Sequence, residues 1–206
     1  MAEKPVTTAG LLYFWYNYLS MNIIITGASK GIGKAIAEIF AANGHTIFIT
    51  SRGELGLYKT MEELQIKFPL ATIKAKPFDL SKKEEAKAFG TWCLSYGVPD
   101  IIINNAGAFE PGSIHNEREG LLEEQLAINL FSAYYFTRTV LPKMMEAKQG
   151  HVFNICSIAA LKAYDNGGAY SISKYALHGF SKNLREEMKP HNIKVTAVFP
   201  GAVLTD

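Results

Sequence analysis

Short apolar runs alternate with longer segments of helical periodicity from residue 21 onward. Several runs are apolar on consecutive positions, for example Ile23, Ile24 and Ile25. Such runs are typical of strands that are covered on both faces of a parallel sheet. Six strands are predicted, over residues 22–26, 45–50, 71–78, 100–104, 151–157 and 193–199.

The segments between these runs predict helices. The first covers residues 31–43 and ends at Asn43-Gly44, which is a common helix C-terminus. Its apolar stripe is expected to consist of Ile32, Ala35, Ile36, Ile39 and Phe40. Further helices are predicted over residues 54–67, 81–95, about 117–147 and about 168–189.

This alternation predicts an α/β fold in a single domain, with a doubly wound parallel sheet of Rossmann-like type. Right-handed crossovers place helices on both faces of the sheet. The expected strand order is 3-2-1-4-5-6, and the ligand crevice of such a sheet lies at the carboxyl ends of its strands, where the order reverses. Functional residues should therefore follow directly after strand ends.

Composition and charge restrict the class of protein. The 206 residues are 48% hydrophobic and 19% charged, which suits one soluble domain with a large core. The net charge of +2 and the absence of long like-charged runs give no support to nucleic-acid binding. Cations near Lys182 alternate with acids, as on a solvated helix face. No apolar run reaches the length of a membrane span.

The two cysteines, Cys93 and Cys156, match neither a CxxC redox pair nor a zinc framework. We expect both to be small buried side chains in a reducing compartment, and Cys156 has no local base that would make it a nucleophile. The expected location is cytoplasmic, and no metal site is expected.

Residues 1–20 form an N-terminal extension that differs from the rest. The stretch "GLLYFWYNYLS" contains five aromatic residues without a clear amphipathic period and lacks the features of a secretory signal. It is interpreted as a dispensable, disordered or non-native leader with Met21 as the true start of the protein, or as a patch that docks on a partner or on its own core.

A glycine-rich loop, "TGASKGIG", follows the first strand directly and opens the first helix. Glycines in this place permit a tight turn and let the backbone approach a pyrophosphate, while the helix N-terminus supplies free N–H donors. The position between a strand and an amphipathic helix predicts a dinucleotide site. The residues expected to contact the cofactor here are Gly27, Ser29, Lys30, Gly31, Ile32 and Gly33.

The ends of the next strands indicate which dinucleotide is bound. An NAD site normally has an acidic residue at the end of strand two, but this sequence has Thr50-Ser51-Arg52. Arg52 and Lys30 suit a 2′-phosphate, so NADP(H) is predicted in preference to NAD(H). Asp79, after strand three, is expected either to cap the following helix or to bind the adenine ring. Asn105, Ala106 and Gly107, in "NNAG" after strand four, leave room for the adenine ribose.

The residues Tyr170 and Lys174 in "YSISK" lie one turn apart on one face of a helix, a spacing that is uninformative by itself. Ser157 lies thirteen residues upstream at the expected end of strand five, and Asn129 lies inside the long preceding helix. The motifs "TGASKGIG", "NNAG", "AINLF", Ser157, "YSISK" and "PGAVLT" occur in this order. Over residues 22–206 the sequence therefore resembles the short-chain dehydrogenase/reductase family.

The resemblance implies an NADPH-dependent carbonyl reductase that also works in reverse as an alcohol dehydrogenase. A carbonyl that accepts hydride needs a proton donor and a polarising hydrogen bond, which Tyr170 and Ser157 would supply. A free phenol has a pKa near 10, and the ammonium of Lys174 would lower it. In similar enzymes the lysine also holds the nicotinamide ribose, and the residue matching Asn129 helps hold a relay water.

The end of the sequence also matches the family in part. Pro200 and Gly201 turn the chain toward the nicotinamide, and Thr205 matches the position that meets its carboxamide. Similar proteins continue beyond the position of Asp206 into a substrate lid, a helix and a seventh strand. We therefore keep a second hypothesis, a cofactor-binding module that is inactive or regulatory, and we expect strand six to be an edge.

The resemblance also implies a small-molecule substrate and a homo-oligomer, either a dimer or a tetramer; which carbonyl is reduced stays open.

Overall fold

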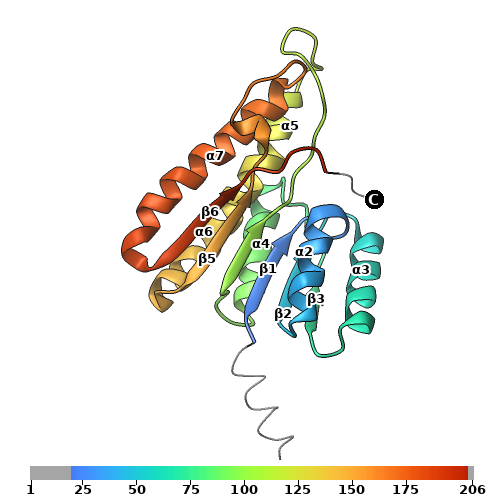
Figure 1. Ribbon diagram of the computed structural model, residues 1–206, viewed down its shortest axis with the longest axis vertical. Coiled ribbons are helices and arrows are strands. Elements are labelled where there is room, and N and C mark those ends of the chain that lie inside the picture. Colours follow the sequence, from blue (N-terminus) through green and yellow to red (C-terminus); the bar gives the residue numbers. More distant parts are fainter. Residues whose placement is uncertain (1–19, 204–206) are drawn as a thin grey trace, which may run out of the picture.

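The computed structural model describes residues 20–203, so residues 1–19 of the expected extension and Thr205 lie outside the described residues. Six parallel strands form one sheet in the order β3-β2-β1-β4-β5-β6, which confirms the predicted fold (Figure 1). β3 and β6 are its edges. The strands are β1 (Asn22–Thr26), β2 (Thr46–Thr50), β3 (Thr72–Ala75), β4 (Ile101–Asn104), β5 (Gly150–Ile155) and β6 (Ile193–Val198).

The consecutive isoleucines of β1 divide the core into two halves. Ile24 belongs to one buried cluster, together with Phe89 and Phe136, whereas Ile23 and Ile25 belong to a second cluster on the opposite face of the sheet. This division follows from the alternation of side chains along a strand. It explains why a strand between two helix layers needs apolar residues at every position.

Helices cover the two faces of the sheet in separate groups. α2 (Gly31–Ala42) and α3 (Glu54–Lys67) pack on the face that Ile23 and Ile25 share. α4 (Lys83–Leu94), α6 (Ser132–Ala147) and α7 (Gly168–Met188) pack on the other. The short α5 (Leu121–Leu126) lies near the start of α7, and the chain between β4 and α5 extends beyond the sheet at that same end (Figure 1).

The expected apolar stripe of the first helix was wrong in part. Ile39 is 63% exposed, and the fully buried positions of α2 are Gly33, Ala37 and Ala41. These three small residues recur every four positions and let the helix backbone approach the sheet closely. Ile36 and Phe40 pack only at the flank of the cluster. A prediction from hydrophobicity alone therefore chose larger residues that lie beside the face of α2 in contact with the sheet.

The long helix predicted over residues 117–147 is also different in the structure. It begins at Leu121, because the preceding Gly120 adopts a left-handed conformation with φ of 81°, and it contains a π-helical turn, η1 (Ala127–Phe131), between α5 and α6. β3 stops at Ala75 rather than residue 78, although Lys76 and Phe78 still donate their N–H groups to the carbonyl oxygens of Ile49 and Ser51. β5 ends at Ile155, so Ser157 lies beyond the strand.

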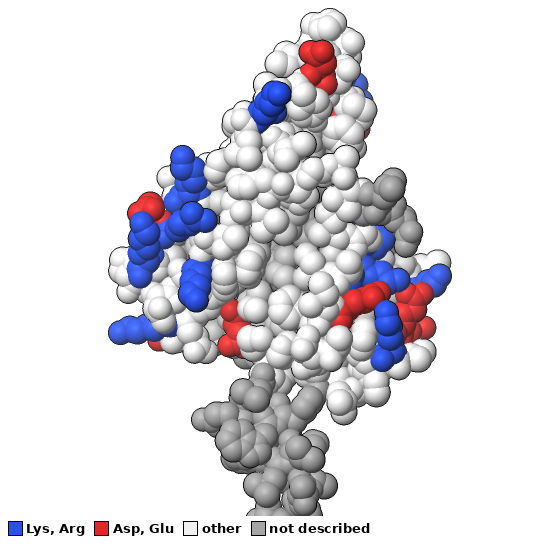
Figure 2. All heavy atoms as spheres, in the orientation of Figure 1, with Lys and Arg blue, Asp and Glu red and all other residues white. Residues whose placement is uncertain are grey.

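Charged side chains are unevenly distributed over the surface. Figure 2 shows few of them over the sheet in the middle of the visible face, and Lys and Arg gathered over α7 at the left. Acids accompany these cations; Lys189, for example, pairs with Glu186 at 2.6 Å. Within residues 20–203, no helix is long and apolar enough to cross a bilayer. Cys93 and Cys156 are buried free thiols.

The stripe of small residues in α2 predicts how the helix responds to substitution. Ala37→Leu would force extra volume between α2 and the sheet, and we expect it to lower the free energy of unfolding by about 1–3 kcal/mol. Ile39→Ala on the same helix should change it by less than about 0.5 kcal/mol, because that side chain is largely exposed. Urea denaturation of both variants measures the difference, and a larger loss for Ile39→Ala would contradict the observed packing.

Candidate functional site

The glycine loop after β1 packs directly against the segment that follows β4. Gly27 and Gly31 have φ of 65° and 57°, a region that glycine adopts without strain. A Cβ on Gly27 would lie 2.8 Å from the Cα of Ala106, and one on Gly33 would overlap the carbonyl oxygen of Gly27. The loop can therefore keep its course only with glycine at these positions.

Asn105 and Thr26 hold these two segments together. The amide nitrogen Nδ2 of Asn105 donates to the carbonyl oxygens of Thr26 and Gly27, both at 2.9 Å. The hydroxyl of Thr26 in turn accepts the backbone N–H groups of Asn105 at 3.0 Å and Ala106 at 2.9 Å. The sequence analysis placed Asn105 among the cofactor-binding residues that leave room for the adenine ribose, and it missed this clamp. The signal in the sequence that could have indicated this contact was the position of Thr26 at the end of β1, opposite "NNAG".

The N-terminus of α2 follows this glycine loop and has no side-chain cap. Its N-cap, Lys30, makes no side-chain cap hydrogen bond, and no acidic residue lies in the first turn. Thr60 of α3 donates to the carbonyl oxygen of Ser29 at 2.9 Å and so fixes the loop from the other side. Lys30 and Arg52 are exposed, and Ile32 is half-buried. Free N–H donors, a positive helix end and nearby cations fit a phosphate group.

Asp79 closes a turn before α4 and does not cap this helix, whose N-cap is Lys82 without a side-chain cap hydrogen bond, so the expected capping role was wrong. Its Oδ1 accepts the backbone N–H of Ser81 at 3.2 Å and the Ser81 hydroxyl at 2.6 Å, while Glu85 accepts the N–H of Asp79 at 2.6 Å. Partial burial opposes ionisation of Asp79. The hydrogen bonds from Ser81 and the charges of Lys82 and Arg52 outweigh burial and lower the pKa of the carboxyl group. An adenine contact stays a prediction.

Lys174 is a buried cation at the carboxyl edge of the sheet. Its side chain is on α7, 5% of the residue is exposed, and Nζ donates to the carbonyl oxygen of Ile155 at 3.0 Å. Burial lowers the pKa of Lys174 to about 8, and the nearby Cys156 opposes this only in part. A Cβ on Gly107 would lie 2.8 Å from Asn129 Oδ1 and 3.4 Å from Nζ, so a side chain after Ala106 would displace Asn129.

Tyr170 lies beside this cation. Lys174 Nζ is 5.8 Å from the centroid of the Tyr170 ring, as expected for one helical turn. The ring contacts Phe109 edge to face at a centroid distance of 4.8 Å. Phe109 follows "NNAG" closely, is 57% exposed and was not identified from the sequence. Tyr170 itself is half-buried.

Ser157 caps the short 3-10 helix η2 (Ile158–Ala160) that follows β5. Its Oγ accepts the N–H of Ala159 at 3.1 Å, which leaves the hydroxyl proton available for another acceptor. Ser171 of α7 donates to the carbonyl oxygen of Ala159 at 2.7 Å and thereby joins this turn to the helix of Tyr170. The backbone N–H of Ile158 donates to the carbonyl oxygen of Pro200 at 3.1 Å, so the segment after β6 also reaches this place.

Asn129 lies in the π-helical turn and is 1% exposed. Its Oδ1 accepts the N–H of Ala108 at 2.9 Å, and Nδ2 lies within 3.0 Å of the Ala108 carbonyl oxygen, Gln125 Oε1 and Ser173 Oγ. The side chain therefore connects the segment after β4 to α7. The sequence predicted one uninterrupted helix over about residues 117–147 and did not identify the π turn that presents Asn129.

A buried polar row lies behind the site. Asn104 donates to Asn154 Oδ1 on β5 at 2.8 Å and to the hydroxyl of Thr137 at 2.9 Å, and Asn154 donates to Ser181 at 2.8 Å. The Oδ1 atom of Asn104 is buried without a hydrogen-bond partner among the described residues. These contacts align β4, β5 and α7, which carry the residues named above.

Known proteins with similar sequences are described as dehydrogenases or oxidoreductases. Residues 21–206 match the family model described as short chain dehydrogenase. An uncharacterized oxidoreductase of Bacillus subtilis, YvrD, is 33% identical over 184 residues, and the match covers 89% of this chain and 69% of the relative. Dehydrogenase/reductase SDR family member 7B of Xenopus tropicalis is 34% identical over 190 residues, covering 89% of this chain and 61% of the relative.

A solved structure is similar over the same region. L-sorbose reductase from Gluconobacter frateurii, complexed with NADPH and L-sorbose, superposes with a TM-score of 0.84 at 30% identity. The match covers 90% of this chain and 71% of that one. Each of these relatives is longer than the region that it shares with this chain.

The buried ammonium predicts a pH-dependent stability. The pKa of Lys174 is about 8 in the folded chain against a usual 10.5, so between these pH values the unfolded chain holds a proton that the folded chain has released. The free energy of unfolding should therefore rise with pH in this window, by up to roughly 3 kcal/mol relative to Lys174→Met. Urea titrations of both chains without added cofactor measure the difference. A difference that does not vary with pH would contradict the burial of this charge.

Proposed function

The chain belongs to the short-chain dehydrogenase family, and we propose that it reduces the carbonyl group of a small molecule with NADPH, in a reversible reaction. One observation carries this proposal. Ser157 follows the end of β5, and hydrogen bonds from Ser171 to Ala159 and from Lys174 to Ile155 hold the helix of the half-buried Tyr170 against this end of the strand. Lys174 Nζ lies 5.8 Å from the Tyr170 ring centroid. The carboxyl end of β5 lies at the edge where a doubly wound sheet binds its ligand.

The glycine loop and the open N-terminus of α2 would hold the pyrophosphate of the cofactor. When bound, NADPH supplies the hydride that the carbonyl carbon accepts. Gly107 lies near Lys174 Nζ and has no side chain, so it leaves space for the cofactor between the glycine loop and Tyr170. The chain thus offers a phosphate site at β1 and a proton donor at α7, with the Asn105–Thr26 clamp between them.

Proton donation completes the reduction. As hydride reaches the carbonyl carbon, negative charge develops on the oxygen and must be neutralised. Tyr170 gives its hydroxyl proton to this oxygen. The Ser157 hydroxyl accepts from Ala159 and can direct its own proton at the same oxygen, which orients the carbonyl and stabilises the developing charge.

Lys174 stabilises the phenolate that Tyr170 becomes. With its pKa at about 8, the side chain is mostly protonated at neutral pH, and a cation in a poorly solvated place interacts strongly with a nearby anion. Asn129 fixes Ala108 and Ser173 around this pair. A water held near Asn129 that returns a proton to Lys174 is the further role that the family resemblance implies, and it stays a prediction.

Tyr170→Phe tests the mechanism. Loss of the proton donor should lower kcat with NADPH and a panel of ketones and aldehydes by about 10²–10⁴-fold, while NADPH binding changes little. Tyr175→Phe on the same helix is the control, because Tyr175 is exposed and should keep normal turnover. Stopped-flow NADPH oxidation measures both variants.

Two outcomes would decide against this mechanism. Equal turnover of the parent chain and Tyr170→Phe would remove Tyr170 from the chemistry. NADPH binding by the parent chain without turnover of any carbonyl in the panel would favour the cofactor-binding module.

The preference for NADPH over NADH rests on Arg52 and Lys30. Both cations are exposed, Arg52 after the end of β2 and Lys30 directly before α2. Arg52 makes no salt bridge within residues 20–203. Arg52 is therefore available for a bidentate contact with the 2′-phosphate. The NADPH complex of L-sorbose reductase, a structural relative, agrees with this choice of cofactor.

Arg52→Ala should weaken NADPH binding by about tenfold or more and leave NADH binding almost unchanged, since one charge-assisted contact to the 2′-phosphate is lost. Fluorescence titration with each cofactor measures the two dissociation constants. Lys59→Ala on α3 is the matched control, because Lys59 is an exposed cation that pairs only weakly with Glu63, at 3.9 Å. Tighter binding of NADH than of NADPH by the parent chain would reverse the preference.

A further inference from the structure

Glu117 caps the helix that carries Tyr170, although it lies 52 residues away in the sequence. Its Oε1 accepts the backbone N–H of Ala169 at 2.7 Å. α7 begins at Gly168, and its N-cap, Gly167, has no side chain that could satisfy the free N–H groups of the first turn. A carboxylate at this end also interacts favourably with the helix dipole. Glu117 thus supplies the cap that the local sequence lacks.

Two glycines make the space for this carboxylate. A Cβ on Gly168 would overlap Glu117 Oε1, and a Cβ on Gly112 would lie 2.6 Å from Glu117 Cγ. Gly112 also donates its N–H to the carbonyl oxygen of Asn166 at 3.2 Å, which brings the segment after β4 against the segment before α7. The half-buried Glu117 side chain therefore packs closely against these two glycines.

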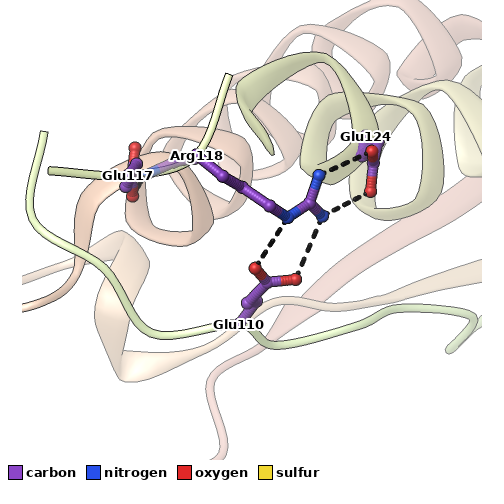
Figure 3. Close-up of polar contacts among 5 residues, drawn as sticks. Glu110, Glu117, Arg118 and Glu124 are labelled. Carbon is purple, nitrogen blue, oxygen red and sulfur yellow. Dashed lines mark hydrogen bonds and ion pairs between the residues drawn. The ribbon is translucent and has the colours of Figure 1, made fainter. Parts of the chain in front are cut away.

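The neighbouring Arg118 holds the same segment in place. Its guanidinium makes two hydrogen bonds to Glu110, at 2.9 and 3.1 Å, and two to Glu124 of α5, at 2.8 and 2.6 Å. Figure 3 shows Arg118 between these two carboxylates, with the Glu117 side chain separate from this cluster. Because both pairs are bidentate, they restrict the orientation of the segment as well as its position.

We propose that Glu117 is a positioning residue for Tyr170, an inference that rests on the proposed function. Two anchors flank Tyr170 in the first turn of α7. Glu117 binds Ala169 from the segment after β4, and Ser171 binds the carbonyl oxygen of Ala159, two residues after Ser157. The Glu117 anchor sets the distance between the Tyr170 hydroxyl and the carbonyl oxygen that Ser157 holds. A small displacement of either group is costly for proton transfer.

The length of the Glu117 side chain provides the test. Glu117→Gln keeps an acceptor oxygen at the same reach, whereas Glu117→Asp keeps the charge but is one methylene too short, and Glu117→Ala removes the cap. We expect Ala and Asp to lower kcat by about tenfold or more with the dissociation constant of NADPH changed less than about twofold, and Gln to stay within about threefold of the parent. Hydrogen exchange of the peptides covering residues 165–176 should rise for Ala and Asp, and not for Gln.

Two controls separate positioning from a general loss of stability. Glu119→Ala removes an exposed acid two residues away and should change none of these measurements. Phe89→Leu in the core should lower the Tm by several degrees while kcat, measured well below the Tm, and exchange at the start of α7 stay normal. If Glu117→Ala does not fold, the comparison between Asp and Gln decides the question.

The outcomes distinguish this inference from the proposed function. Unchanged hydrogen exchange in Glu117→Asp, or equal kcat losses in Gln and Asp, would overturn the role of Glu117. Raised exchange together with a parent chain that turns over no carbonyl would overturn the reductase proposal and leave the cap at α7 supported. Raised exchange with kcat unchanged in Ala and Asp would show a cap that does not position Tyr170, and would overturn the inference.

Discussion

The hydrogen bonds between Thr26 and Asn105 join β1 and β4 at the point where the strand order of the sheet reverses. Strands diverge there because their crossovers leave toward opposite faces, and the backbone groups at the strand ends lose their ladder partners. The amide of Asn105 satisfies two of these carbonyl oxygens, and the hydroxyl of Thr26 satisfies two N–H groups. With these groups paired, the glycine loop can remain open at the start of α2.

Side chains also satisfy backbone groups that follow the end of β4 and that end β5. Asn129 pairs with both backbone polar groups of Ala108, and Lys174 donates to Ile155 where β5 has ended. The amide of Asn129 needs the π turn to reach Ala108, and Lys174 needs space beside Gly107. Residues that satisfy the strand ends are therefore neighbours of the residues proposed for catalysis, and Lys174 belongs to both groups in the proposed mechanism. The hydrogen bond to Ile155 and the proposed role beside Tyr170 together explain why Lys174 is buried, although burying a charge costs free energy.

Much of the fold followed from local patterns. The apolar runs indicated six strands, and the run of isoleucines in β1 correctly indicated burial on both faces. Boundaries that depend on backbone chemistry were less well predicted. Gly120 delays the start of α5 by its left-handed conformation, and β3 ends at Ala75, before the predicted residue 78. The contact stripe of α2 could not be recognised from hydrophobicity, because close packing on the sheet favours Ala37 and Ala41 over the larger Ile39.

The sequence by itself determined the family, the order of the strands and the residue types of the site, because periodicity, glycine positions and the spacing of Tyr170 and Lys174 are local properties of the chain. The tertiary structure decided which side chains meet. The bonds from Asn105 to Thr26 and from Glu117 to Ala169 join positions 79 and 52 residues apart. No spacing rule applies at such separations, since the geometry of such contacts depends on how the whole sheet and its helices pack.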